Sequence, residues 1–465
     1  MKSVALHNLG CKVNSYEMDV MQQMLRERGY KIVPFDEAAD IYIINTCTVT
    51  NIADRKSRQM IHRAKKCNPD AVVVAVGCYV QTAGDAIAQE EAVDIAIGNN
   101  RKKDIVAVLE NYLKDREAAK FHHEKARAEQ AGELPECGSA GESNRPPVIL
   151  ERIDIGSTKE YEEMQLTGTT DHTRAYIKIQ DGCNQFCSYC IIPYARGRVR
   201  SRAEEDILRE VRGIVEAGYR EIVLTGIHIS SYGIDRGSPE LLRLLKKMHA
   251  INGLERIRLG SLEPRIVTEE FADQISRLPK ICPHFHLSLQ SGCDSVLGRM
   301  NRHYTTGEYF QTTEILRKYY QKPAITTDVI VGFPGETEEE FRMTEAFVRK
   351  VNFYEMHIFK YSRRQGTRAA AMEFQLTEAE KGRRSAVLAQ AEREMSHEYR
   401  AGYLNREVEV LFEEKKETDG KTYWIGHTPQ YIKAAIEAEE GMELGNQTVR
   451  GVAAGFLEDD IMLLK

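Results

Sequence analysis

The sequence contains no apolar run long enough to cross a membrane, so we expect neither a membrane-spanning helix nor a membrane partner. Its first residues, Met-Lys-Ser-Val-Ala-Leu-His-Asn, break their apolar run almost at once, which is atypical of a signal peptide. Ten cysteines without a signal peptide indicate a reducing cytoplasm. Excess positive charge is also missing. The formal net charge is −6 at pH 7, so a nucleic-acid partner must bind local basic patches.

Length and apolar content indicate an enzyme of several domains rather than a small or largely disordered protein. The 465 residues predict about two to four domains. A hydrophobic fraction of 42% gives each of them enough side chains for a core.

A fourth cysteine is missing near the most informative motif of the chain. Cys183, Cys187 and Cys190 stand in Asp-Gly-Cys-Asn-Gln-Phe-Cys-Ser-Tyr-Cys, after an apolar run at 175–179 that predicts a strand. Structural zinc prefers four ligands in two pairs, whereas the next cysteine is Cys282. Three thiolates on a four-iron cluster leave one iron open for another ligand. The motif therefore predicts an open iron-sulfur cluster rather than a zinc site.

Three more cysteines each follow a predicted strand in the first hundred residues. Apolar runs rich in β-branched residues alternate there with segments of helical length, which predicts a doubly wound parallel sheet. These runs are residues 4–7, 41–44 and 72–76. Cys11, Cys47 and Cys78 follow them, and loops at the carboxyl ends of parallel strands line one crevice. The alternative is buried core thiols, but the threefold repetition favours a second three-thiolate cluster.

The other cysteines and histidines of this region are interpreted as non-ligands. Cys67 ends a basic helix before Asn-Pro, and Cys137 lies in a polar stretch. His122 and His123 stand in a charged segment, where a solvated helix face is the usual arrangement. Residues 110–173 lack strong apolar periodicity and are typical of a linker with some helix.

Strand–helix alternation returns after residue 174, and the end of the chain changes character. The further apolar runs are residues 222–225, 257–259, 285–289, 327–331 and 354–359. From about residue 402, short strands punctuated by glycine predict a small all-β barrel.

Several of these motifs resemble a known family. The spacing Cys-x3-Cys-x2-Cys, with Tyr189 before the last cysteine, resembles the signature of radical S-adenosylmethionine (SAM) enzymes. Residues 9–17 (LGCKVNSYE), 44–50 (INTCTVT) and 76–81 (VGCYVQ) resemble the amino-terminal domain of the methylthiotransferases. The resemblance covers nearly the whole chain and implies an α/β multidomain fold. Its parts would be a methylthiotransferase amino-terminal domain at 1–113, a linker at 114–168, a partial (βα)6 radical SAM barrel at 169–400 and an all-β TRAM barrel at 401–465.

The resemblance also implies cofactors and partners. Two sets of cysteines would each bind a [4Fe-4S] cluster: Cys183, Cys187 and Cys190 the radical cluster, and Cys11, Cys47 and Cys78 the auxiliary cluster. In this family the open iron chelates SAM, and an electron from the cluster yields a 5′-deoxyadenosyl radical that abstracts hydrogen. A second SAM methylates a sulfur at the auxiliary cluster, and the methylthio group is transferred to C2 of an adenine. The expected partners are tRNA, an electron donor such as flavodoxin or ferredoxin, and a sulfur source.

Five residues are candidate SAM contacts under this resemblance: Tyr189, Gly226, Ser288, Gln290 and Gly332. Glycine at 226 would let the backbone approach the methionine part of SAM. Ser288 and Gln290 would contact its ribose or carboxylate, and Gly332 begins a tight turn near the expected adenine end.

Each of these positions also fits ordinary turn chemistry. Glu263 and Arg299 are similarly placed, and a structural ion pair is the alternative for them.

Basic and aromatic side chains are candidate RNA contacts. Alternating arginines after the cluster motif would point to one side of a strand; they are Arg196, Arg198, Arg200 and Arg202. Residues 55–66 hold six cations and no acid on one predicted helix. Aromatic residues of the terminal barrel would stack on bases; they are Tyr423, Trp424 and Tyr431. However, residues 401–465 contain 7 Lys and Arg against 13 Asp and Glu, a balance that does not attract phosphates.

Three substrates are known in the family: isopentenyladenosine in tRNA, threonylcarbamoyladenosine in tRNA, and an aspartate of a small-subunit ribosomal protein. The motif Cys-Lys-Val-Asn-Ser-Tyr-Glu resembles the threonylcarbamoyl branch, so we expect 2-methylthio-N6-threonylcarbamoyladenosine, next to the anticodon, as the product. An acidic terminal barrel would suit a basic ribosomal protein. A hypothesis of another class is a non-catalytic RNA-binding iron-sulfur sensor, which leaves the barrel-length middle region unexplained.

Changing Cys11, Cys47 and Cys78 together to alanine is expected to halve the iron content of anaerobically purified protein, because one of two clusters loses its ligands. Cleavage of SAM to 5′-deoxyadenosine should persist. Iron and sulfide analysis checks the first result and chromatography the second. Iron at the wild-type level would contradict the assignment of these cysteines.

Overall fold

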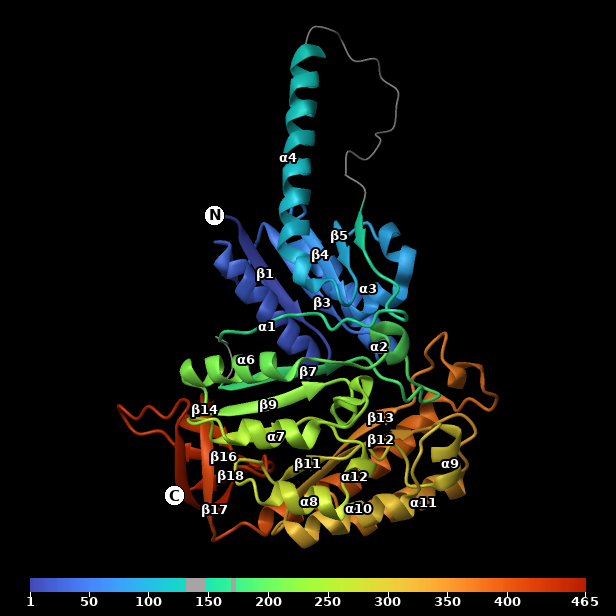
Figure 1. Cartoon of the computed structure of the whole chain (residues 1–465), viewed down its shortest axis with the longest axis vertical. Helices are drawn as coiled ribbons and strands as arrows, with labels where there is room; N and C mark the ends of the chain where they lie inside the picture. The colour runs from blue at the N-terminus through green and yellow to red at the C-terminus, as the bar shows by residue number, and fades with distance from the viewer. Residues whose placement is uncertain (131–147, 169–172) are drawn as a thin grey trace. The chain divides into compact units, whose positions relative to one another are not determined.

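The computed structural model describes residues 1–130, 148–168 and 173–465. The chain forms two compact units (Figure 1). The first contains residues 1–165 together with 194–198, and the second contains 166–193 together with 199–465. Cys137 lies outside the described residues, as do the side chains of His122 and His123.

The first unit contains a six-stranded parallel sheet in the order β2-β1-β3-β4-β5-β6, which confirms the predicted parallel sheet. The strands are β1 (Ser3–Asn8), β2 (Lys31–Val33), β3 (Ile41–Thr46), β4 (Val72–Gly77), β5 (Ile95–Ile97) and β6 (Ile149–Glu151). The helices are α1 (Lys12–Glu27), α2 (Asn51–Cys67), α3 (Cys78–Ala83) and α4 (Ile105–Gln130), with 3-10 turns η1 (Gly84–Gln89) and η2 (Lys102–Asp104).

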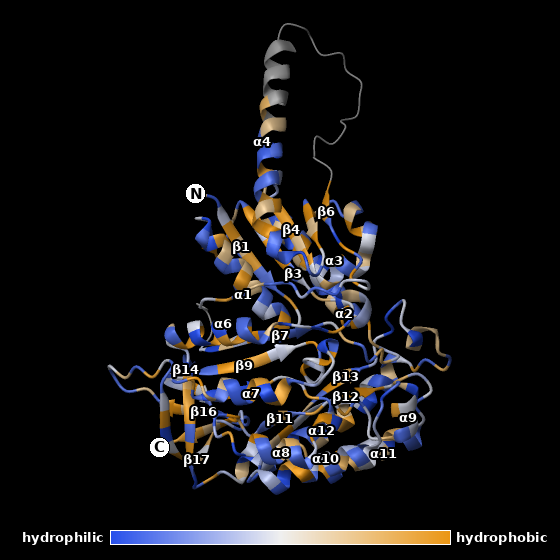
Figure 2. Cartoon of the chain, viewed as in Figure 1, coloured by the Kyte–Doolittle hydropathy of each residue, from blue (hydrophilic) through white to orange (hydrophobic). Residues whose placement is uncertain are grey.

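The centre of this sheet explains why its strands are continuous apolar runs. Every residue of β3 and β4 is buried, as expected for strands covered on both faces. Figure 2 shows the apolar residues concentrated on strands such as β1 and β4. The region predicted as a linker contributes more than a connection, because α4 extends to Gln130 and β6 pairs with β5.

The second unit contains parallel strands in two hydrogen-bonded groups, β10-β9-β7-β8 and β11-β12-β13. Bridges between Ile257 and Ile281 and between Leu262 and Leu287 join the groups, which confirms the six parallel strands of a partial barrel. The strands are β7 (Arg174–Asp181), β8 (Arg200–Ser201), β9 (Glu221–Gly226), β10 (Arg256–Leu259), β11 (His284–His286), β12 (Ala324–Val331) and β13 (Glu355–Lys360), of which the short β8 is antiparallel to β7.

Helices follow most of these strands. They are α6 (Glu204–Glu216), α7 (Leu241–His249), α8 (Glu269–Ser276), α9 (Asp294–Arg299), α10 (Thr306–Tyr319), α11 (Glu338–Val351) and α12 (Glu378–Ala401). The 3-10 turns are η3 (Ile229–Ser231), η4 (Ile234–Arg236), η5 (Pro264–Ile266) and η6 (Arg368–Ala371). The short helix α5 (Ile192–Arg196) lies where the chain passes from one unit to the other.

The second unit ends in a closed barrel in the order β14-β15-β16-β18-β17. Its strands are β14 (Glu407–Thr418), β15 (Lys421–His427), β16 (Lys433–Glu437), β17 (Thr448–Glu458) and β18 (Ile461–Leu464). We call it the C-terminal barrel. It confirms the small all-β region predicted from the sequence.

A loop of the C-terminal barrel packs against the amino-terminal ends of the parallel strands. The Tyr431 ring stacks between those of His427 and His284, at centroid distances of 4.6 and 5.2 Å. The guanidinium groups of Arg258 and Arg174 lie 4.7 and 5.0 Å from the same ring. Stacked aromatic rings and cation–π contacts together fix this loop in place.

An ion pair lies beneath this loop. Arg258 donates to Glu221 at 2.8 Å and to the Pro429 carbonyl at 2.9 Å, and both charged side chains are buried. Burial alone would raise the pKa of the Glu221 carboxyl, but the neighbouring Arg258, Arg174 and Arg256 lower it below its usual value. The carboxylate is therefore held ionised inside the protein.

The aromatic residues predicted to stack on RNA are instead packed inside the protein, so that prediction is wrong for this structure. Tyr431 is enclosed by His284 and His427 as described. Tyr423 and Trp424 expose only 7% and 5% of their surface. Trp424 Nε1 donates to the Met442 carbonyl at 3.1 Å. Buried tryptophan normally finds such a partner, and a ring used in a core has no free face for a base.

No helix among the described residues is long and apolar enough to cross a membrane.

Replacing Glu221 with alanine is expected to lower the free energy of unfolding by about 3–5 kcal/mol, because it leaves Arg258 buried without its counter-charge. The matched control is Glu255→Ala, which breaks the exposed pair with Arg220 and should cost about 0–1 kcal/mol. Chemical denaturation of both variants checks the difference. Equal costs would show that the ion pair beneath Tyr431 does not stabilise the fold.

Candidate functional site

The first set of thiols lies at the carboxyl ends of three neighbouring strands. Cys11 immediately precedes α1, Cys47 follows β3, and Cys78 begins α3 directly after β4. Gly10 precedes Cys11 with φ +112°, and a Cβ built on it would lie 3.2 Å from Cys47 Sγ. Glycine is needed there because the loop carrying Cys11 passes so close to Cys47.

The three thiols are close enough to affect one another electrostatically. Burial raises the pKa of Cys47 to about 12, and the neighbouring Cys78 and Cys11 add to that increase. Arg196 acts in the opposite direction and lowers the pKa. The structure therefore brings together the three cysteines that the sequence pattern selected, together with a cation.

The cation is a buried arginine that touches one of these sulfurs. Arg196 Nε donates to Cys78 Sγ at 3.3 Å, and its other nitrogens donate to Glu17 at 2.8 and 3.0 Å and to Asn14 Oδ1 at 2.6 Å. Asn99 Nδ2 donates to Cys78 Sγ at 3.4 Å. The sulfur of Cys78 therefore accepts two hydrogen bonds, both from side chains of the first unit.

The same network is completed by a lysine. Lys102 donates to Glu17 Oε2 at 2.7 Å and to Asn99 Oδ1 at 2.6 Å, and its side chain is buried. Glu17 therefore balances two cations, while Asn99 is held with its amide directed at Cys78 Sγ. Buried polar networks of this kind hold their members in one arrangement when every member is bonded.

The prediction that four alternating arginines line one side of a strand is wrong. Arg196 ends helix α5, and Gly197 adopts φ +72°, so the extended backbone of β8 begins only at Arg200. Arg200 and Arg202 are buried beside Asp181 and Glu210, respectively. Only Arg198 of the four is exposed, so phosphate contact remains a prediction for that residue alone.

The predicted basic helix does present its charges to solvent. Arg55, Lys56, Arg58 and Lys66 are exposed on α2, and Arg63 pairs with the exposed Asp36 at 2.6 Å. Exposed lysines and arginines on one helix form the local basic patch that the net charge of the chain requires for RNA binding.

The second set of thiols lies in the loop that leaves β7. Hydrogen bonds on both sides of Ser188 hold the loop: its nitrogen donates to the Met300 carbonyl at 2.9 Å, and its carbonyl accepts from Ala369 at 2.8 Å. Burial raises the pKa of Cys183 to about 11 and that of Cys190 to about 12, and Cys187 adds to both increases. The three cysteines of the motif are therefore close enough to affect one another electrostatically.

A second arginine contacts this set, and the sequence reasoning missed it. Arg302 Nη1 donates to Cys187 Sγ at 3.3 Å, and its guanidinium lies 4.8 Å from the Tyr304 ring. Tyr304 is in turn held by the Ser288 and Leu289 carbonyls, to which its hydroxyl donates at 2.6 and 2.8 Å. No spacing pattern connects Arg302 to the cysteine motif, so the sequence offered no signal for it.

The candidate SAM contacts occupy well-defined positions, and their role stays a prediction. A Cβ on Gly226 would lie 3.0 Å from Gln180 Oε1, and one on Gly332 would lie 2.3 Å from a Lys381 side-chain carbon. Packing by the protein itself therefore already requires glycine at both positions.

The other three candidate SAM contacts differ in burial and backbone conformation. Gln290 is buried with φ +70°, Ser288 is half-buried, and Tyr189 packs against the buried cluster that includes Phe333 and Tyr361.

Glu263 and Arg299 each belong to an ion pair with another partner. Arg299 donates to Glu340 at 2.7 and 2.9 Å, which lowers the pKa of that carboxyl to about 2. Glu263 accepts from Arg265 at 2.8 Å. A structural ion pair, rather than a SAM contact, therefore fits Arg299.

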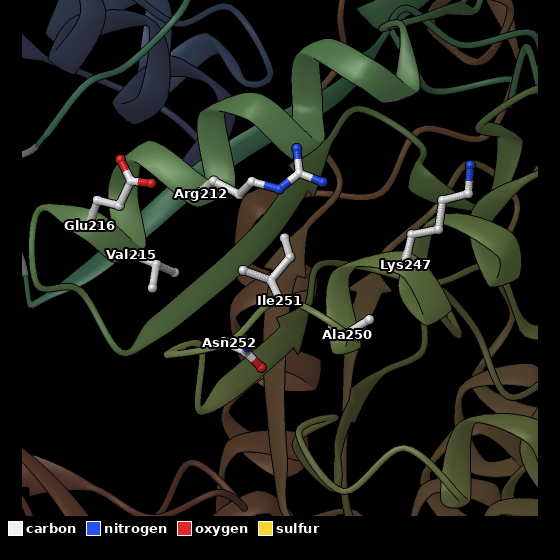
Figure 3. Close-up of a pocket in the computed structure, with 7 residues that line it drawn as sticks. All are labelled: Arg212, Val215, Glu216, Lys247, Ala250, Ile251 and Asn252. Atoms are coloured by element: carbon white, nitrogen blue, oxygen red, sulfur yellow. The ribbon is translucent and has the colours of Figure 1, made fainter.

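A surface hollow of about 360 Å³ lies on the outer helices of the second unit (Figure 3). Arg212 and Glu216 of α6 and Lys247 of α7 line it together with the loop at Asn252. It contains none of the cysteines, so we do not assign it to the candidate site.

Two family models match the chain. Residues 3–98 match "Uncharacterized protein family UPF0004", and residues 177–348 match "Radical SAM superfamily". "Threonylcarbamoyladenosine tRNA methylthiotransferase MtaB" of Bacillus subtilis is 40% identical over 98% of this chain and 95% of its own length. The chain belongs to the tRNA methylthiotransferase family. Members of this family use [4Fe-4S] clusters and SAM, so the two sets of cysteines described above are the candidate cluster ligands.

Other comparisons agree with this membership. "tRNA-2-methylthio-N(6)-dimethylallyladenosine synthase" of Moorella thermoacetica is 34% identical over 90% of this chain and 88% of its own length. The solved radical SAM methyltransferase TsrM of Kitasatospora setae, with cobalamin and a [4Fe-4S] cluster bound, matches with a TM-score of 0.55 at 16% identity. That match covers 79% of this chain and 74% of TsrM, and it shows a shared fold.

The residues present fit the clusters that the methylthiotransferase family requires. Each set offers three thiols, which bind iron as thiolates, and burial by itself opposes their ionisation. Arg196 donates to a sulfur of one set and Arg302 to a sulfur of the other, each at 3.3 Å. A guanidinium cannot lose its proton in proteins, so each set has a permanent positive charge beside its thiolates.

Replacing Arg302 with methionine is expected to make the reduction potential of the cluster at Cys187 more negative, because a cationic donor to a ligand sulfur favours the added electron. A hydrogen bond to a charged group is worth about 1.5–3 kcal/mol, so the shift should be up to about 60–130 mV. A redox titration followed by electron paramagnetic resonance measures it, in protein whose Cys11, Cys47 and Cys78 are alanine. Arg342→Met, at an exposed position, is the control. Equal potentials in both variants would contradict the role of Arg302.

Proposed function

We propose that this chain replaces the hydrogen at C2 of N6-threonylcarbamoyladenosine in tRNA, next to the anticodon, with a methylthio group. Support comes from the 40% identity to the relative named for this substrate, over 98% of the chain. The observation that carries the proposal is the pair of three-thiol sets, each with a guanidinium on one sulfur. One set alone suffices to generate a radical, whereas sulfur insertion requires a second.

When bound, the clusters and SAM supply the one-electron chemistry that removes an unreactive hydrogen and the sulfur and methyl group that replace it. The chain itself holds and shields these groups. Arg302 and Arg196 place fixed positive charge on the ligand sulfurs. Tyr304 and Tyr189 pack beside Arg302 and Cys187, which keeps that side of the site dry and limits quenching of a reactive intermediate.

We assign the tRNA backbone to the exposed cations of α2 and to Arg198, because these are predicted RNA contacts that remain in solvent. The C-terminal barrel is acidic, and Tyr423 and Trp424 are buried in it. Any RNA contact of this barrel would therefore use other residues. We retain the domain limits 1–113, 114–168, 169–400 and 401–465 as a functional division.

Turnover also requires partners that supply electrons and sulfur. We propose an electron donor of the flavodoxin or ferredoxin class, since one-electron cleavage of SAM needs a strong reductant, and a separate sulfur source to refill the auxiliary site. Tyr189, Gly226, Ser288, Gln290 and Gly332 are our proposed SAM contacts.

The main alternative substrate is the isopentenyl-type adenosine, for which the relative from Moorella thermoacetica is named. Its identity of 34% is below the 40% of the relative named for the threonylcarbamoyl substrate, which favours our choice. The third family substrate, a ribosomal-protein aspartate, is favoured only by the acidic C-terminal barrel.

Deleting the gene for this chain is expected to abolish 2-methylthio-N6-threonylcarbamoyladenosine in tRNA, while the unmethylthiolated nucleoside accumulates. Mass spectrometry of tRNA nucleosides measures both, and the isopentenyl-type nucleosides serve as internal controls. Unchanged 2-methylthio-N6-threonylcarbamoyladenosine would eliminate this substrate, and loss of the isopentenyl derivative would select the alternative.

The same purified protein tests whether the chain is a sensor rather than an enzyme. Anaerobic incubation with SAM and dithionite should release 5′-deoxyadenosine. If none forms although both clusters are present, the non-catalytic sensor is the better explanation.

A further inference from the structure

Three potential metal ligands meet on one face of the second unit, away from both sets of cysteines in sequence. They lie on adjacent parallel strands: His286 on β11, Asp328 on β12 and His357 on β13. The register pairs Asp328 with His357, and it pairs His286 with Thr326, two residues before Asp328. Residues two apart on a strand share a face, so the sheet itself places all three side chains on the same side.

The side chains are close enough to share one ion. Their ligand atoms all lie within 4.8 Å of one another, and this is the only such group of histidine, cysteine, aspartate or glutamate among the described residues. His286 Nε2 is 3.2 Å from Asp328 Oδ2. Two ligands on an ion at bond lengths of about 2.0–2.2 Å are separated by roughly this distance.

His286 is oriented like a histidine that binds a metal through one ring nitrogen while a neighbouring protein group holds the other. Its Nδ1 is 3.0 Å from the Thr326 hydroxyl, which itself lies 3.4 Å from His284 Nε2. Metal-binding histidines characteristically use one ring nitrogen for such a contact and the other for the metal. This contact directs Nε2 of His286 towards the Asp328 carboxylate.

His286 Nε2 is a buried polar atom without a hydrogen-bond partner. The atom forms no hydrogen bond even to Asp328 Oδ2, which is only 3.2 Å away. When Thr326 accepts the Nδ1 proton, the Nε2 lone pair faces a carboxylate oxygen, and two acceptors at this distance repel. A cation between them removes the repulsion and gives both atoms a partner.

The third side chain completes the set. His357 stacks on His286, with ring centroids 5.8 Å apart and an interplanar angle of 26°. It is exposed, whereas His286 and Asp328 expose 12% and 28% of their side chains. An ion therefore has an approach from solvent past His357, whose ligand atom lies within 4.8 Å of those of His286 and Asp328.

We propose that His286, Asp328 and His357 bind one divalent first-row transition-metal ion, such as Zn²⁺ or Fe²⁺. Two imidazoles and one carboxylate suit these ions rather than Mg²⁺ or Ca²⁺, which prefer sets made of oxygen donors. Three protein ligands leave coordination positions open, so the ion would accept an oxygen donor such as a carboxylate from a bound molecule. The proposal does not depend on the substrate assigned above.

The test uses the full-length chain with both clusters in place and Zn²⁺ as the probe. The protein is equilibrated anaerobically with Zn²⁺, freed of excess ion and analysed for zinc and iron. We expect about one zinc per chain beyond the clusters, since the donors form a single site. His357→Gln should reduce zinc affinity at least tenfold at unchanged iron content, and Asp328→Asn should do the same. His357 is exposed, so its variant should fold even if Asp328→Asn does not.

The control is His62→Gln, an exposed histidine of the first unit whose partner is Glu90. This variant should retain the zinc of the wild-type chain. The proposal fails if the wild-type chain holds no zinc beyond its clusters, or if His357→Gln binds zinc as tightly as His62→Gln. It also fails if zinc rises only as iron falls, because the zinc would then occupy cluster cysteines. Failure of tRNA modification would leave the zinc result unaffected, so the two proposals are tested separately.

Discussion

Both candidate cluster sites share one interaction, a hydrogen bond from an arginine guanidinium to a cysteine sulfur. Thiols must ionise to bind iron, yet burial raises the pKa of Cys47 and Cys190 to about 12. Shielding such groups from water protects a reactive intermediate, but the same desolvation favours the neutral thiol. Arg196 opposes the increase in pKa at Cys47 and Arg302 opposes it at Cys190, because each places a positive charge near the thiol.

The two arginines are themselves held in different ways. Arg196 is bonded to Glu17, which also binds Lys102, so two cations share one carboxylate and the excess positive charge remains beside Cys78. Arg302 donates to Cys187 Sγ and lies over the ring of Tyr304. A cation–π contact positions a guanidinium without neutralising it. Both arrangements leave net positive charge available to the sulfur.

In the C-terminal barrel, packing uses an aromatic side chain that the sequence predicts as an RNA contact. Tyr431 is aromatic, lies in a barrel of a type associated with RNA, and would stack on a base if it were exposed. The structure instead inserts it between two histidines and two arginines at the start of the parallel strands. That end of the strands carries the buried cation Arg258, which pairs with Glu221, donates to the Pro429 carbonyl and lies over the Tyr431 ring.

The sequence was sufficient to locate the cysteines because their signal is local. A strand followed by a cysteine recurs three times, and the second set is contiguous, so neither required knowledge of distant contacts. The arginines could not be found in this way, since Arg302 is 115 residues from Cys187 and Arg196 is 118 residues from Cys78. The sequence pattern predicts Arg196 as an RNA contact on a strand, whereas the structure buries it against Cys78 Sγ. Alternation suggested a strand, but Gly197 at φ +72° ends a helix just after it, and a positive φ at glycine leaves no trace in a hydrophobic pattern.

The path of the chain links the two sets of thiols through a short covalent connection. Cys190 ends one set, and after residues 191–193 the segment 194–198 belongs to the first unit, where Arg196 contacts Cys78. Breaking a buried ion pair such as Arg196–Glu17 costs about 3–5 kcal/mol, so this segment is firmly anchored.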